Sequence, residues 1–91
     1  MKKRIDVTQS DIDAGQRDSV DDCPIAIAAS RCLGVTCAAF GKTIDFRDSR
    51  GFFDGYAVTP QEVRDFISAF DSFGRGAVKP MSFDLEVPNV N

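Results

Sequence analysis

The chain contains no histidine. Without an imidazole it cannot form a Ser-His-Asp or Cys-His nucleophilic pair, and it lacks the commonest general base near neutral pH. The zinc and iron ligand sets that need imidazole are excluded for the same reason. We therefore expect a protein that is not an enzyme and that holds no cofactor or metal.

Cysteine is scarce, with an odd number of three: Cys23, Cys32 and Cys37. Their spacing includes no C-x-x-C pair and matches no structural zinc signature. Three free thiols, two of them packed as small apolar groups, are favoured over a metal site of three thiolates and an aspartate. Cys23 lies at the start of a predicted helix, where a thiolate pKa is lowered. A thiol-dependent enzyme is a weaker alternative, because no histidine could act as its base.

Long apolar runs and an excess of positive charge are also missing. No apolar run approaches the roughly 20 residues that cross a bilayer. The basic residues 2–4 are followed by an alternating apolar and polar pattern and not by the continuous apolar stretch of a signal peptide. Eleven basic and 14 acidic residues give a formal charge of −3, which disfavours direct binding to nucleic acid. We expect a cytoplasmic protein with neither a membrane nor a nucleic acid as its direct partner.

What is present is ordinary globular composition, with 43% hydrophobic residues in a chain of 91, which predicts one domain over residues 1–91. Residues 4–8 alternate between apolar and polar, as in a half-buried strand. Capping side chains over residues 8–11 favour a short helix that ends at Gly15. Residues 16–22 are polar and predict a loop.

The strongest helix signal follows this loop. Asp22 or Cys23 is placed to cap the helix, Pro24 suits its first turn, and Gly34 is placed to end it. The residues between are apolar on almost every side, so the helix is expected to be buried against a sheet. Only Ser30 and Arg31 break this apolar surface, and we expect Arg31 to pair with a surface aspartate.

Two adjacent segments predict a hairpin. Residues 35–40 and 43–47 are rich in strand formers and flank Gly41-Lys42, and residues 52–58 contain a further short strand interrupted by Gly55.

A second helix is predicted after a capping box, with Thr59 as N-cap, Pro60 at the first position and Glu62 at the third. Its apolar side chains form one stripe that we expect to face the core: Val63, Phe66, Ile67, Phe70 and Phe73. Residues 82–87 alternate again and predict a closing strand.

These elements predict an α+β fold of two layers, with two helices packed on one face of a mainly antiparallel sheet of four or five strands. The first and last strands are candidates to lie side by side. The open face would then carry polar side chains from the strands: Arg4, Asp6, Thr43, Asp45, Arg47, Asp84 and Glu86.

Carboxylates make the first candidate site. The segment from Asp11 to Asp22 holds five aspartates against one arginine. Asp84 and Glu86 are two residues apart in the predicted closing strand, which places their side chains about 6.6 Å apart on one face. We therefore predict an acidic surface that binds a basic partner, formed by Asp11, Asp13, Asp21, Asp22, Asp84 and Glu86. The alternative is a solvated face that keeps the domain soluble.

Aromatic residues make the second candidate site. Phe52, Phe53 and Tyr56 surround a glycine-containing turn, and aromatic side chains on loops are favoured anchors in protein interfaces. The alternative is that two of the three cap the core.

Two strings resemble small bacteriophage and prophage accessory proteins. Residues 7–15 follow V-T-x-x-D-I-x-x-G, and residues 23–28 follow C-P-I-A-x-A, with Ser19 between them. Residues 78–85 are similar to the closing strand of those proteins, with Met81 where an aromatic is more usual. Small acidic phage proteins without a catalytic constellation are often binders of host machinery, including anti-CRISPR and other anti-defence inhibitors.

The resemblance and the acidic residues together imply a non-enzymatic phage inhibitor in the bacterial cytoplasm. It would block a basic nucleic-acid-binding site on a host protein or nucleoprotein complex. The alternative function is a structural or assembly module of a phage that self-associates through the Phe52–Tyr56 loop or a sheet edge.

Overall fold

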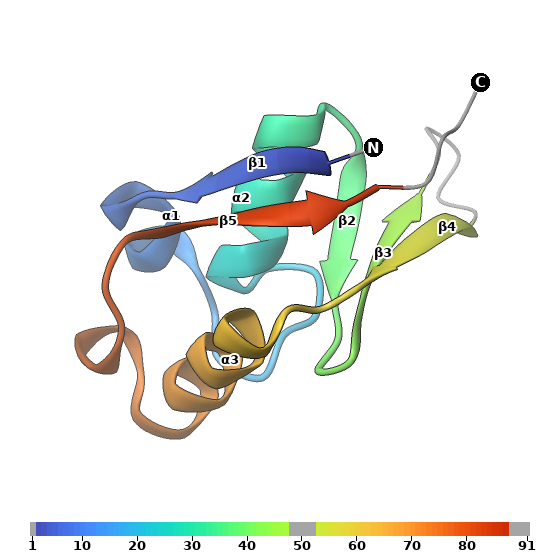
Figure 1. Cartoon of the computed structure of the whole chain (residues 1–91). Helices are drawn as coiled ribbons and strands as arrows, with labels where there is room; N and C mark the ends of the chain where they lie inside the picture. Colours follow the sequence, from blue (N-terminus) through green and yellow to red (C-terminus); the bar gives the residue numbers. More distant parts are fainter. Residues whose placement is uncertain (1, 48–52, 88–91) are drawn as a thin grey trace.

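A computed structural model of the chain describes residues 2–47 and 53–87 (Figure 1). The α+β class is confirmed. In chain order the elements are β1 (Lys2–Val7), α1 (Gln9–Ala14), α2 (Pro24–Leu33), β2 (Thr36–Ala39), β3 (Thr43–Arg47), β4 (Phe53–Val58), α3 (Gln61–Phe73), the 3-10 turn η1 (Arg75–Ala77) and β5 (Met81–Glu86).

The five strands form two antiparallel sheets rather than one. The first and last strands pair, as predicted, from Lys2 opposite Glu86 to Val7 opposite Met81. The second sheet has the order β2-β3-β4. β4 and β5 are in contact, but no ladder joins them in the described part of the chain.

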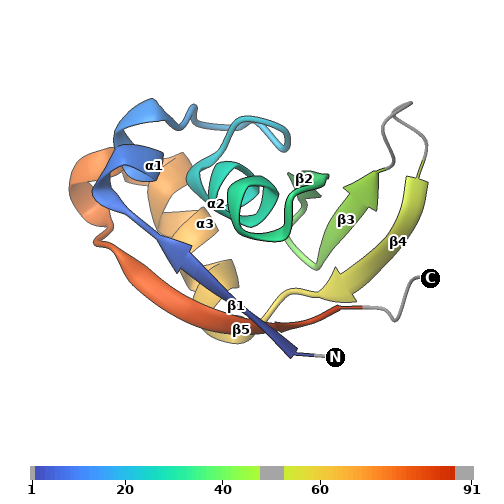
Figure 2. The same cartoon turned by 90° about the horizontal axis from the view of Figure 1, so that it is seen from above.

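Helix α2 explains why the sheet is split. It lies between the two sheets and contacts both β1 and β2 (Figure 2). Because it is apolar almost all round, it must be covered on more than one side, and a single flat sheet covers only one. Apart from Pro24, its buried side chains belong to one cluster that also takes in residues of all five strands and of α1 and α3.

The ends of α2 follow the sequence prediction. The Cys23 sulfur accepts a hydrogen bond from the Ala26 N–H at 3.4 Å, and Pro24 occupies the first turn. Gly34 ends the helix with φ 72°, a left-handed conformation that favours glycine.

Two predictions for α3 are wrong. Pro60, not Thr59, takes the N-cap position; Thr59 is buried and its hydroxyl donates to the Phe40 carbonyl at 3.4 Å. Phe73 was expected in the core but is 79% exposed. At 3.6 residues per turn it lies about 80° round the helix from Val63, at the margin of the apolar stripe, and Gly74 ends the helix directly after it.

Candidate functional site

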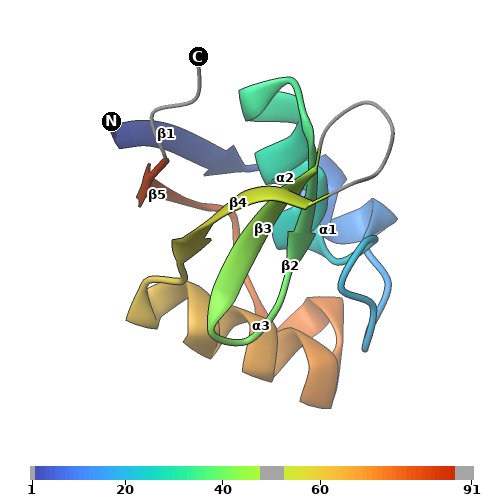
Figure 3. The same ribbon diagram turned by 90° about the vertical axis from the view of Figure 1, so that its right-hand side faces the viewer.

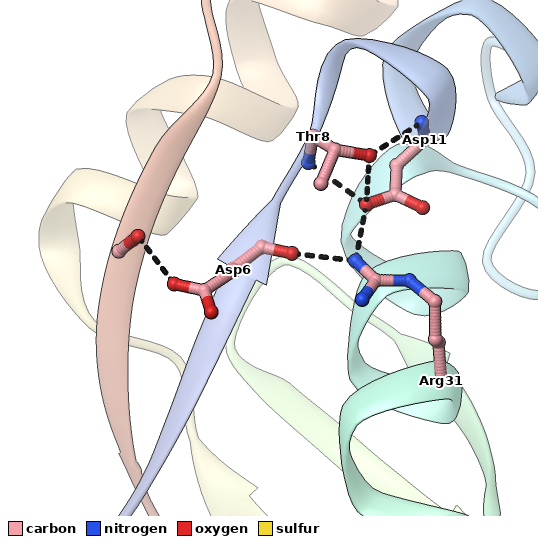
Figure 4. Close-up of polar contacts among 5 residues, drawn as sticks. Asp6, Thr8, Asp11 and Arg31 are labelled. Carbon is pink, nitrogen blue, oxygen red and sulfur yellow. Dashed lines mark hydrogen bonds and ion pairs between the residues drawn. The ribbon is translucent and has the colours of Figure 1, made fainter.

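Asp11 is not part of an exposed acidic surface. It is 4% exposed, and its Oδ2 accepts hydrogen bonds from the Thr8 N–H at 2.8 Å and from the Thr8 hydroxyl at 3.0 Å (Figure 4). Arg31 donates to the same oxygen at 2.7 Å and to the Asp6 carbonyl at 2.7 Å. The Asp11–Arg31 pair thus links α1 and α2 to β1, and Asp11 does not contribute to the predicted exposed surface.

The surroundings of Asp11 keep it ionised. Burial opposes the charge, but the hydrogen bonds from Arg31 and Thr8 outweigh it and lower the pKa of the Asp11 carboxyl. Arg31 therefore pairs with an aspartate, as expected, although with a buried one rather than a surface one.

Asp84 and Glu86 are exposed on β5 but do not form an acidic row. In the ribbon formed by β1 and β5, Arg4 lies opposite Asp84 and Lys2 lies opposite Glu86. Opposite charges in directly facing positions attract each other across the strands. The ribbon therefore presents alternating charge to a partner.

Asp6, on β1 of the same ribbon, is likewise paired with a basic residue. It forms an ion pair with Arg4 at 2.8 Å and accepts the Ser82 hydroxyl at 2.7 Å. The hydrogen bonds from Ser82 and then from Arg4 lower the pKa of the Asp6 carboxyl.

The loop over residues 15–22 is separated from this ribbon. It lies on the far side of α2 from β1 and β5 (Figures 2 and 3). The six predicted acidic residues are therefore not one surface, because the strand pair and the loop cover different sides of α2.

Backbone hydrogen bonds connect the loop to itself and to β2. The Gln16 N–H donates to the Asp22 carbonyl at 2.8 Å, which closes the loop on itself. The Ala39 N–H donates to the Val20 carbonyl at 2.7 Å, which attaches the loop to the edge of β2. Asp18 adopts φ 56°, a left-handed turn conformation that aspartate tolerates.

Arg17 ties the loop to the end of α3. Its Nε donates to the Asp71 carbonyl at 3.0 Å, and its Nη2 donates to the carbonyls of Asp71 and Ser72, each at 2.8 Å. The Asp18 N–H donates to Asp71 Oδ1 at 3.0 Å. A guanidinium is favoured there because the last carbonyls of a helix lack intrahelical donors.

Three exposed carboxylates lie in this loop, and a fourth is exposed at the end of α1: Asp18, Asp21, Asp22 and Asp13. Within residues 2–47 and 53–87 none of them forms an ion pair, since Arg17 is directed at carbonyl oxygens. The sequence prediction named three of the four. It missed Asp18, although the excess of aspartates in this segment was the signal that could have included it.

The aromatic candidates are placed only in part. Phe52 and the side chain of Phe53 lie outside what the structure describes. Tyr56 is 54% exposed on β4, opposite Asp45, so it does not cap the core. Val58 on the same strand is 66% exposed.

All three cysteines are free thiols, as predicted. Cys23 and Cys37 are buried and Cys32 is exposed. Burial raises the pKa of the Cys23 thiol, despite the N–H groups at the start of α2, and raises the pKa of Cys37 to about 11. The prediction of a lowered pKa at Cys23 is therefore wrong.

This difference in burial predicts the thiol chemistry of the folded protein. One equivalent of a thiol-reactive disulfide reagent is expected to react rapidly at pH 8, and three equivalents after unfolding in guanidinium. Cys32→Ser should remove the rapid phase, whereas Cys23→Ser should leave it intact. Rapid reaction of two thiols in the native protein would contradict the burial of Cys23 and Cys37.

In the described part of the chain no group of three or more His, Cys, Asp or Glu side chains is placed to hold a metal ion. No helix there combines the length and apolarity needed to span a bilayer. Comparisons with family models, with curated proteins and with solved structures find no significant match to this chain.

Proposed function

We propose that this protein is a non-enzymatic inhibitor whose acidic loop occupies a basic, nucleic-acid-binding surface of a host protein. The acidic loop is defined here as residues 15–22 together with Asp13 at the end of α1. The phage anti-defence context comes from the resemblance of residues 7–15 and 23–28 to phage accessory proteins.

The observation that carries the proposal is a set of exposed carboxylates on a fixed backbone without basic partners of their own. Asp13, Asp18, Asp21 and Asp22 are exposed and form no ion pair in the described residues. Because the loop is attached to β2 and α3 by hydrogen bonds, binding would order little additional chain. A preorganised surface loses less conformational entropy on association.

Charge complementarity supplies the mechanism. A surface that binds the phosphates of nucleic acid is rich in Lys and Arg, and carboxylates held at fixed positions can pair with the same groups. The attraction between the negative loop and the positive surface of the partner also speeds their diffusional encounter. The association rate constant should therefore be high and should fall as the salt concentration rises. The inhibitor would exclude nucleic acid by occupying its site, with no covalent step.

The test is affinity capture from bacterial lysate at low and high salt, followed by binding measurements on the captured protein. Asp21→Asn/Asp22→Asn is expected to weaken binding about tenfold or more and to flatten its salt dependence. Neither side chain makes an ion pair within the described residues, so the fold should be kept, as circular dichroism would verify.

Asp84→Asn/Glu86→Asn is the matched control, since it removes the same charge from the other side of the molecule. Binding should change little in this variant. If both double variants lost the same affinity for the partner, net charge alone would account for binding. If Asp21→Asn/Asp22→Asn lost no affinity, the proposed site would be overturned.

A further inference from the structure

An open groove lies beside the acidic loop, with a volume of about 550 Å³. It runs between the start of the loop and the end of α3, and its lining includes Arg17, Phe73, Arg75 and the glycines Gly15, Gly74 and Gly76. Figure 3 shows the loop and the end of α3 on the same side of the molecule. The hydrogen bonds of Arg17 to Asp71 and Ser72 hold the two walls together.

The groove is apolar with a positive rim, which is unusual in a chain of net charge −3. Phe73 is 79% exposed, the highest value among the large apolar side chains described. Arg17 and Arg75 are both exposed and also line the groove. Three of the lining residues are glycines, so a bound chain could approach the backbone closely.

The acidic loop has the complementary chemistry. Val20 is 37% exposed at its middle, and exposed carboxylates flank it at Asp18, Asp21 and Asp22. The acidic loop thus carries an apolar side chain among carboxylates, and the groove beside it carries the exposed Phe73 together with Arg17 and Arg75. Two patches that complement each other on one side of a molecule are the requirement for an isologous two-fold contact.

We propose that the occupant of the groove is the acidic loop of a second copy of this chain. In a two-fold dimer Val20 of each copy lies against the exposed Phe73 of the other. Asp21 and Asp22 face Arg75 across the interface, and every contact occurs twice. The proposal stands independently of the inhibitory function. If both hold, the dimer and a basic partner exclude each other, because both cover Asp21 and Asp22.

The first experiment is sedimentation equilibrium of the whole protein over a range of concentration and salt. A mass that rises with concentration toward two chains, and a dissociation constant that increases with salt, are expected. Phe73→Ser should raise that constant about a hundredfold, because an exposed aromatic anchor is lost from both halves of the contact. Because Phe73 is exposed, the Phe73→Ser monomer should stay folded. A mass of one chain at every concentration would overturn the proposal.

A charge exchange tests the reciprocal geometry. Arg75→Asp alone, and Asp21→Arg/Asp22→Arg alone, should each be monomeric, because each places like charges together at both contacts. Mixed in equal amounts, the two variants should recover a dimer, since each contact then again joins an acid to a base. Failure of the mixture to associate would contradict the pairing.

Matched controls separate this surface from others. A Cβ at Gly76 or at Gly41 would meet nothing within 4 Å, so both positions accept a larger side chain. Gly76→Leu should fill part of the groove and weaken the dimer, and Gly41→Leu should not. Val58→Ser should also have no effect. Loss of the dimer with Val58→Ser and not with Phe73→Ser would place the interface on β4 and overturn the proposal.

Discussion

Arg31→Met is expected to lower the free energy of unfolding at pH 7, and by more than the loss of the exposed Arg4–Asp6 pair does, because it leaves the Asp11 carboxylate buried without its cation. Methionine keeps most of the apolar stem of the side chain. Arg31 itself is half exposed, with a side-chain exposure of 49% against 5% for Asp11. We therefore expect a loss below the largest values found for buried pairs. Urea denaturation followed by circular dichroism would measure it.

The pH dependence identifies the cause. The pKa of Asp11 is lowered in the folded protein, so its ionised form stabilises the fold fully above the unfolded pKa of about 3.9. This stabilisation is lost as the pH falls through the folded pKa. The difference between wild type and Arg31→Met should thus be largest near neutral pH and should shrink toward pH 2.

An exposed ion pair provides the control for Arg31. Arg4→Met breaks the pair between Arg4 and Asp6, which are 71% and 53% exposed, and should lower the free energy of unfolding much less than Arg31→Met does. Equal losses for the two variants, or a loss for Arg31→Met that does not change with pH, would contradict the role assigned to the Asp11 pair.

Gly15→Ala is expected to lower the free energy of unfolding by about 2–3 kcal/mol through overpacking. A Cβ on Gly15 would lie 2.5 Å from both Cδ and Cγ of Pro24 and 2.9 Å from its nitrogen. The φ of Gly15 is −71°, so the backbone conformation suits alanine and only the close approach to α2 forbids it. Thermal unfolding would report the change.

Gly41→Ala is the matched control for this effect. Its Cβ would meet nothing within 4 Å, and the change should stay within about 0.5 kcal/mol. A Gly15→Ala variant as stable as Gly41→Ala would mean that the start of α2 can move away from the loop without loss.

Local signals in the sequence predicted most of the elements. Alternation predicted β1 and β5, and the Pro24 and Gly34 positions predicted the ends of α2, because these patterns depend on neighbours in the chain. Thr8 and Asp11 form the capping box of α1 through contacts three residues apart. Where a competing partner was distant in sequence, the local signal failed: Thr59 bonds to Phe40 instead of capping α3.

In the candidate site, too, some features follow from the local sequence and others from contacts between distant residues. The sequence by itself determined that aspartates gather between residues 11 and 22, that no histidine is present and that an apolar helix needs covering. Only the tertiary structure decided which carboxylates are exposed. Arg31 holds Asp11 inside, the pairing of β1 with β5 sets basic residues opposite Asp84 and Glu86, and the end of α3 leaves Phe73 beside the acidic loop. Each depends on packing between residues far apart in the chain, which alternation, capping and composition do not encode.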